Sequence, residues 1–347
     1  MNSQAILILA QDALTNSSIY VLLAIATILV FATTRILFMP QGEFVVFGGL
    51  SLASFQAGKM PGTVWLLLLL ACAAAITQTV RLLMAGAARH LPRVLAETLL
   101  PAFVIAYAAH IFAPMHLALG WQVVLTMLIV TPMGSLIYEV AFRPLADSST
   151  LVLLTAAVAV HFVLLGAGLL FFGPEGFRTP PFSQAQFVFG SVIVSGQSLW
   201  IYAICIVLTA SLAWFFGKTM YGKALRAVAF NRQGARLVGI DPCLVGSLSL
   251  AMAAAIGALS GVLIGPITTL FYDSGFLIGL KGFVGAIFGG LAAYPAAVAG
   301  SVLVGFIESY SSYWWSDYKD VIVFCLIIPV LLWRSLSHVQ QDDEELF

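Results

Sequence analysis

The sequence predicts an all-α polytopic membrane protein with about 9–11 transmembrane or re-entrant helices in a single domain, residues 1–347. Hydrophobic residues make up 61% of the chain, charged residues make up 9%, and the mean hydropathy is +1.04. Apolar runs near the ~20 residues that a helix needs to cross the hydrocarbon layer recur along the whole length. These runs are expected to be helical, because the bilayer core offers no water to unpaired backbone groups.

About eleven segments are candidates for spanning or deeply buried helices, and two of them are short. In chain order they are 18–36, 43–57, 62–79, 98–115, 119–138, 150–172, 197–217, 244–270, 277–292, 295–309 and 319–336. The segments 43–57 and 277–292 fall below the ~17 residues of an untilted span. We expect them to be tilted, re-entrant or half-helices enclosed by protein, and such segments are where transporters tend to bind cargo.

The basic residues predict the orientation, because short loops rich in Lys and Arg stay in the cytoplasm. With an odd number of crossings and an internal carboxyl terminus, only Lys59, Arg178, Lys281 and Lys319 fall outside. The expected cytoplasmic set is Arg35, Arg81, Arg89, Arg93, Arg143, Lys218, Lys223, Arg226, Arg232, Arg236 and Arg334. We therefore expect an external amino terminus and a cytoplasmic carboxyl terminus.

Residues 218–242 form the predicted cytoplasmic segment, and 221–240 is expected to be one long cationic, amphipathic helix. Such a helix lies on a membrane face or in a groove of a partner protein. The alternative is a solvated basic loop that only orients the chain. Gly239 is expected to end the helix.

Several classes of function are disfavoured. The formal net charge of zero argues against nucleic acid as a partner. The histidines show no HExxH pattern and the cysteines no CxxC pair, so no catalytic residue and no metal site is predicted. His161 lies inside an apolar segment, where we favour a hydrogen bond to a neighbouring helix over a functional role. Gly217-Lys218-Thr219 lacks the glycine of a phosphate-binding loop at Leu212, so ATP-driven transport would need another chain.

Several blocks in the right order resemble the permease subunits of branched-chain amino acid (LivH-type) ABC importers. The blocks are Ser17–Tyr20, Thr34–Leu37, Gln41–Phe44, Glu139 with Ala141–Leu145, Phe172–Pro174, the basic segment, and Gly279–Leu291 continuing to Glu308. The chain departs from the family pattern at Phe38–Gln41, where an Asn and a His are expected. It also departs at 79–118, which we predict to be inserted helices.

The resemblance implies the ABC importer permease fold, a bacterial inner membrane and no covalent chemistry on this chain. It also implies a second homologous permease, two cytoplasmic ATPase subunits that bind ATP and Mg²⁺, a periplasmic solute-binding protein and contact with membrane lipid. The cargo would be branched-chain amino acids or related small solutes such as amides, urea, and aromatic or apolar acids. The residues implied in ATPase coupling are Gly222, Leu225, Arg226, Ala229, Arg232, Ala235, Arg236 and Gly239.

Two further residue sets are predicted. The pathway candidates are Tyr20, Gln41, Glu43, Ser51 and Ser54, although Glu43 could equally stabilise a helix end and the serines could bond to their own backbone. Glycines at four-residue spacing predict close helix packing, and the alternative is that they line the pathway. They are Gly257, Gly261, Gly265, Gly285 and Gly289.

Smaller features are also interpreted. Pro266 is expected to kink its helix, and Glu139 and Arg143 to form a surface pair. The competing class of function is an ATP-independent secondary transporter or an intramembrane enzyme. A secondary transporter should hold ionisable groups near the bilayer midplane, for which His161 is the main candidate.

Overall fold

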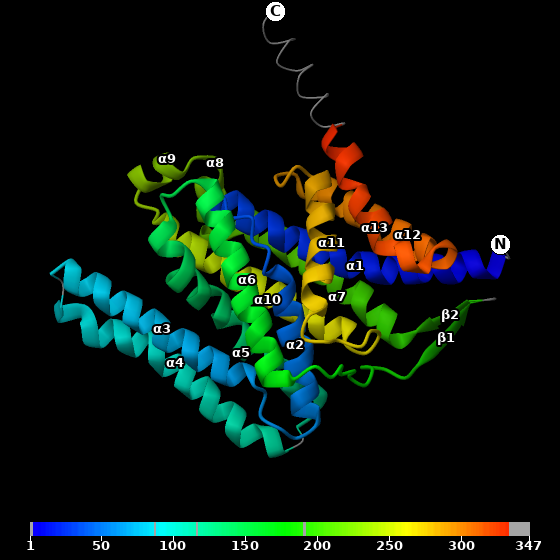
Figure 1. The fold of residues 1–347 in the computed structure, drawn as a ribbon, viewed down its shortest axis with the longest axis horizontal. Coiled ribbons are helices and arrows are strands. Elements are labelled where there is room, and N and C mark those ends of the chain that lie inside the picture. Colours follow the sequence, from blue (N-terminus) through cyan, green and yellow to red (C-terminus); the bar gives the residue numbers. More distant parts are fainter. Residues whose placement is uncertain (1–2, 87, 116, 190–191, 333–347) are drawn as a thin grey trace, which may run out of the picture.

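The computed structural model describes residues 3–86, 88–115, 117–189 and 192–332, which form a helical bundle with one small hairpin (Figure 1). The helices are α1 Ser3–Thr34, α2 Gln41–Gln56, α3 Thr63–Met84, α4 Leu91–Phe112, α5 Leu119–Ile137, α6 Thr150–Phe172, α7 Gly196–Lys218, α8 Met220–Phe230, α9 Arg232–Leu237, α10 Pro242–Ile264, α11 Ser274–Phe288, α12 Tyr294–Trp314 and α13 Lys319–Cys325. The strands β1 Gln186–Phe189 and β2 Val192–Ser195 pair antiparallel.

Each of the eleven expected segments overlaps one of these helices. Within the described residues, seven helices are long and apolar enough to cross a membrane, and α11 is a shorter apolar helix. The predicted all-α polytopic fold is therefore confirmed. The predicted segment 319–336 extends past residue 332 and so partly lies outside the described residues, as does Arg334.

Three features differ from the sequence predictions: the start of α1, the end of α10 and the presence of a hairpin. Helix α1 begins at Ser3 instead of residue 18, because no Pro or Gly interrupts the chain before Thr34. Helix α10 ends at Ile264, so Pro266 follows the helix and does not kink it. The pyrrolidine nitrogen of Pro266 has no hydrogen to continue the helical bonding. The hairpin β1–β2 was not predicted.

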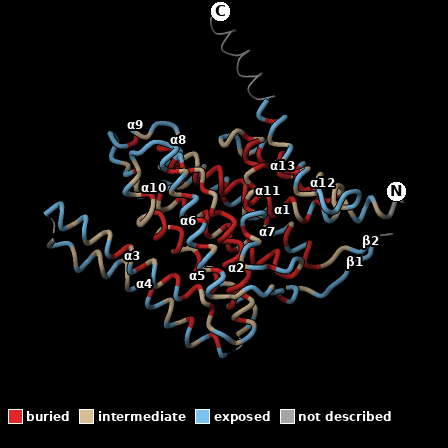
Figure 2. Tube along the Cα trace, in the orientation of Figure 1, coloured by how far each residue is buried: buried red, intermediate tan, exposed pale blue. Residues whose placement is uncertain are grey.

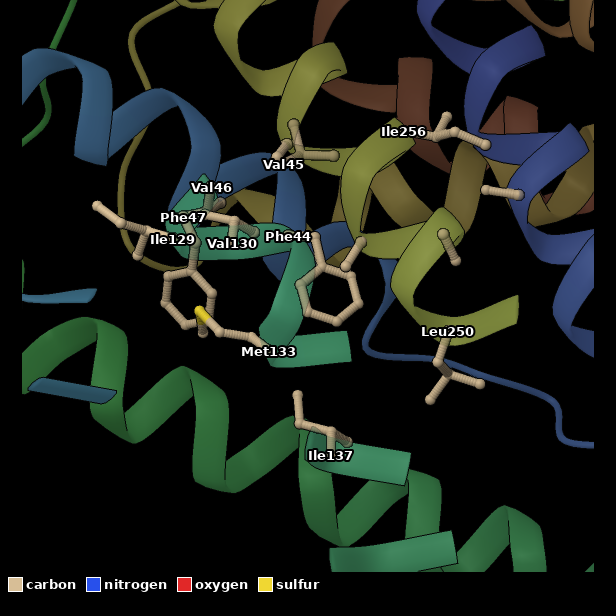
Figure 3. Close-up of a cluster of buried hydrophobic side chains, with 14 of the residues drawn as sticks. Phe44, Val45, Val46, Phe47, Ile129, Val130, Met133, Ile137, Leu250 and Ile256 are labelled. Atoms are coloured by element: carbon tan, nitrogen blue, oxygen red, sulfur yellow. The ribbon is translucent and has the colours of Figure 1, made fainter. Parts of the chain in front are cut away.

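The short helix α2 lies at the centre of the bundle, and most of its residues are buried (Figure 2). Phe44 and Phe47 of α2 pack among Met133 of α5 and Leu250 of α10 in one apolar cluster (Figure 3). Glycines allow the close approach, since a Cβ on Gly42 would overlap the backbone of Gly275 in α11. Helix α2 is therefore the enclosed, short segment that the sequence predicts.

The predicted inserted region 79–118 contains α4, which lies at the edge of the bundle against α3 (Figure 1). In the most apolar 18-residue stretch of the span Leu91–Met115, only 11% of the residues are buried inside the bundle. The exposed apolar side chains of α4 include Leu100, Phe103 and Tyr107. This helix therefore presents most of its surface outside the bundle.

Ion pairs gather several arginines at one end of the bundle, which we call the basic end. Arg81 at the end of α3 and Arg143 after α5 both lie near Glu139, at 3.7 Å and 2.6 Å. Arg236 of α9 pairs with Asp147 at 3.3 Å. The hairpin β1–β2 and the amino-terminal end of α1 lie at the opposite end, the hairpin end (Figure 1).

Candidate functional site

The five predicted pathway residues form separate sets of contacts in the structure. The Gln41 amide donates to the carbonyl oxygen of Ala253 at 2.9 Å, and the hydroxyls of Ser51 and Thr63 lie 2.7 Å apart. Ser54 donates to the carbonyl oxygen of Leu50 in its own helix. Ser54 thus follows the alternative of a bond to its own backbone, whereas Gln41 and Ser51 tie α2 to α10 and α3.

Glu43 and His161 form a buried contact between α2 and α6. Nδ1 of His161 lies 3.1 Å from Oε1 of Glu43, and the two side chains are 9% and 1% exposed. The His161 ring also packs against Phe276 of α11, with ring centroids 5.0 Å apart. His161 thus contacts neighbouring helices, and it joins a residue that the sequence analysis treated separately.

Tyr20 belongs to a buried polar network that we call the ionic cluster, formed by Tyr20, Lys281, Glu308 and Asp320. The Tyr20 hydroxyl donates to Oε2 of Glu308 at 2.5 Å, and Nζ of Lys281 lies 2.5 Å from Oε1 of Glu308. Lys281 also lies 2.8 Å from Oδ1 of Asp320. The cluster therefore ties α1, α11, α12 and α13 together.

The ionic cluster was not predicted from the sequence, because Lys281 was expected to lie outside the membrane. In the structure the Lys281 side chain is buried in α11. The available signal was a lone cation within an apolar, glycine-rich segment, since such a charge needs a paired anion. The identity of the partners could not be read from the sequence, because Tyr20 and Glu308 are 288 residues apart.

A polar cavity of about 730 Å³, which we call the outer chamber, opens at the hairpin end. It lies between α1, the start of α7, the end of α12 and the loop after α10. Its lining residues are Leu9, Gln11, Asp12, Thr15, Asn16, Arg178, Pro181, Ser195, Gln197, Ser198, Pro266, Ile267, Thr268, Glu308, Ser309, Ser312, Tyr313 and Lys319. Apart from Glu308, no member of the ionic cluster lines it, and neither do the predicted pathway residues.

The segment 218–242 forms a tip of two helices instead of one, because the chain breaks at Asn231 (φ −148°, ψ 102°). The Asn231 side chain caps α9 by accepting from the Gly234 amide at 2.8 Å. Thr219 caps α8 in the same way, and Asp241 caps α10. Gly239 follows α9 with a φ of 86°, as expected of a residue that ends a helix.

The buried face of the tip anchors it to the bundle. Leu225, Val228 and Ala235 pack against Leu29 of α1 and Val245 of α10. The side chains of Leu225 and Ala235 are buried within this chain, where they fix the position of the tip. The part of these two residues in ATPase coupling stays a prediction.

The remaining predicted coupling residues divide between anchoring and exposure. Arg232 donates to the carbonyl oxygen of Ala146 at 3.0 Å, and Arg236 pairs with Asp147, so both hold the tip to the preceding loop. A Cβ at Gly222 would overlap the backbone at Phe215. Arg226 is exposed and Ala229 is half-buried.

The tip also exposes large apolar side chains. Phe230 is 94% exposed, Leu237 is 89% exposed and Val238 is 75% exposed. They lie at the basic end, beyond the last residues of α7. Exposed apolar side chains on a rigid, capped element are typical of an interaction site.

Comparison with known proteins identifies the family. Residues 96–331 match the family model described as "Branched-chain amino acid transport system / permease component". The chain belongs to this family. The permease is 30% identical over 227 residues to the high-affinity branched-chain amino acid transport system permease protein BraD of Pseudomonas aeruginosa, which covers 63% of this chain and 74% of BraD.

Other relatives are also permeases. The chain is 31% identical over 225 residues to the LivH permease of the high-affinity branched-chain amino acid transport system of Escherichia coli K12, covering 61% of this chain and 73% of LivH. It is 24% identical over 137 residues to the autoinducer 2 import system permease protein LsrC of Shigella flexneri, covering 36% and 40%. The family match includes the tip and most of the ionic cluster, and it begins inside the region 79–118, whose insertion stays a prediction.

Proposed function

We propose that this permease is the membrane subunit of an ATP-driven importer in a bacterial inner membrane. It would work with a second homologous permease, two cytoplasmic ATPase subunits that bind ATP and Mg²⁺, and a periplasmic solute-binding protein. Family membership supports this proposal. The chain would carry out no covalent chemistry itself.

The observation that carries the proposal is the rigid, exposed tip at the basic end. Three side-chain caps and a buried apolar face fix it, while Phe230, Leu237 and Val238 face outward. Lys and Arg residues surround the tip, which favours a cytoplasmic location. A tip with these properties can dock in a groove of an ATPase and transmit its displacement to α7 and α10.

The proposed cargo is a branched-chain amino acid or a related small organic solute. The names of BraD and LivH refer to branched-chain amino acid transport, which supports the first choice. The name of LsrC refers to autoinducer 2, so relatives at lower identity carry another class of solute.

Copurification tests the docking of the tip. In membranes that contain the cognate ATPase, the wild-type chain should bring the ATPase with it, and Phe230→Asp should reduce the recovered ATPase at least tenfold. A charge at the centre of an apolar docking surface is strongly unfavourable. The matched control is Val188→Asp, because Val188 is exposed at the hairpin end and should leave the ATPase bound. Full ATPase recovery with Phe230→Asp would overturn the docking assignment.

The buried Glu43–His161 contact and the ionic cluster favour one alternative, a secondary transporter that couples to protons or sodium. Reconstituted vesicles distinguish the two. Uphill uptake by this chain in a proton or sodium gradient, with no ATPase subunit present, would support the alternative. Uptake that requires the ATPase and internal ATP would support the importer.

A further inference from the structure

We infer that the outer chamber binds a small zwitterion, an organic solute that carries both an ammonium and a carboxylate group. The inference rests on the proposed permease function and names the place where the solute is held at the hairpin end. The chamber volume of about 730 Å³ lies within the roughly 300–1,000 Å³ of small-molecule sites.

The chamber holds a buried polar group that the protein leaves unsatisfied. Ser309 is 5% exposed, and its hydroxyl lacks a hydrogen-bond partner among the described residues. Buried hydroxyls are almost always paired with protein, water or ligand. The Asn16 side chain, on the α1 wall, likewise forms no hydrogen bond to the described residues. The chamber therefore offers hydrogen-bonding groups that are free to contact a solute.

The chamber also carries free charges of both signs. In the described part of the chain, Asp12, Arg178 and Lys319 line the chamber without forming an ion pair. Arg178 is partly fixed, because its Nε donates to the carbonyl oxygen of Pro266 at 2.9 Å. Glu308 is already paired with Lys281. The free set thus comprises one anion for an ammonium group and two cations for a carboxylate.

The chamber is mechanically connected to the tip. Its wall includes Ser195, Gln197 and Ser198 at the start of α7, and α7 runs along the outside of the bundle to Lys218. Thr219 then leads directly into α8 of the tip. A displacement of the tip would therefore move the wall that closes the chamber.

Cysteine protection tests the chamber. Ser312 lines it and is half-buried, so Ser312→Cys, made in full-length chain with the four native cysteines replaced, should react with a thiol reagent in membrane vesicles. Millimolar L-leucine should slow this reaction at least about fivefold, because an occupied site excludes the reagent. The matched control is Ser316→Cys, exposed four residues further on and outside the chamber, whose reaction should not change.

Two analogues test the zwitterion. 4-Methylpentanoate lacks the ammonium group of leucine and 3-methylbutylamine lacks the carboxylate, so each should slow labelling less than about twofold. Asp12→Asn and Lys319→Gln should each raise the leucine concentration for half-protection by about tenfold, as expected for losing one charged contact. If Ser312→Cys does not react, Asn16→Cys is read in the same way.

The inference is overturned if leucine leaves the labelling rate unchanged, if either analogue protects as well as leucine, or if Ser316→Cys is protected equally. The measurement uses neither ATP nor an ATPase. If leucine protects but no ATPase copurifies, the proposed ATPase partner is refuted and the binding site in the chamber stands. If the ATPase copurifies but leucine does not protect, only the binding site in the chamber is refuted.

Discussion

At the scale of single residues, the ionic cluster is the least expected feature of the permease. A charge buried in a protein is tolerated only when it is paired, and Lys281 meets both Glu308 and Asp320. The Tyr20 hydroxyl satisfies the second oxygen of Glu308. The cluster joins four helices from both ends of the sequence, so its removal should loosen the bundle.

Lys281→Met should destabilise the permease by on the order of 3–5 kcal/mol, because it leaves buried carboxylates without a cation. The double variant Lys281→Met, Glu308→Gln should be more stable than the single variant, since only the more exposed Asp320 remains charged. Thermal unfolding in detergent measures both.

Arg93→Met supplies the control for that experiment. Arg93 pairs with Glu97 on peripheral α4, where both side chains are largely exposed, so its loss should leave the unfolding temperature almost unchanged. Equal unfolding temperatures for Arg93→Met and Lys281→Met would show that the cluster does not stabilise the bundle.

At the scale of elements, α2 shows why glycine spacing matters. A Cβ at Gly261 of α10 would overlap the carbonyl oxygen of Val45 in α2, and one at Gly48 would overlap the backbone of Ala258. The two helices therefore pack backbone against backbone. The other spaced glycines also abut neighbours, such as Gly285 against Ser301 of α12.

Gly261→Ala should destabilise the permease by about 1–3 kcal/mol, because the added methyl forces α2 and α10 apart. Gly166→Ala is the matched control, since a Cβ at Gly166 in α6 meets nothing within 4 Å. Its unfolding temperature should equal or slightly exceed that of wild type. A Gly261→Ala variant as stable as Gly166→Ala would contradict the close packing.

The helices could be predicted from the sequence, but the break in the tip was not. Apolar runs of near-membrane length mark α3, α5, α6 and α7 directly. The polar residue Asn231 was a readable cap signal, as were Thr219 and Asp241, yet the amphipathic pattern across 221–240 outweighed it. Which face of the tip is buried depends on Leu29 and Val245, and their position relative to it comes only from the fold.

At the scale of the whole molecule, the two ends of the bundle differ in character. The basic end carries the tip with its exposed apolar side chains, and the hairpin end carries the outer chamber. The positions of Lys and Arg along the sequence predict the basic end, because short loops rich in these residues lie on one side of the membrane. The chamber could not be predicted, since its walls come from residues near 12, 178, 197, 267 and 309.

The sidedness of the tip tests the central claim most directly. Leu237→Cys, with the native cysteines replaced, is exposed to a membrane-impermeant thiol reagent in spheroplasts and in inverted vesicles, with Val188→Cys at the hairpin end as the opposite control. Leu237→Cys should react only in inverted vesicles and Val188→Cys only in spheroplasts. Reaction of Leu237→Cys in intact spheroplasts would place the tip outside the cell, where no ATPase could move it, and would refute ATP-driven transport through the tip.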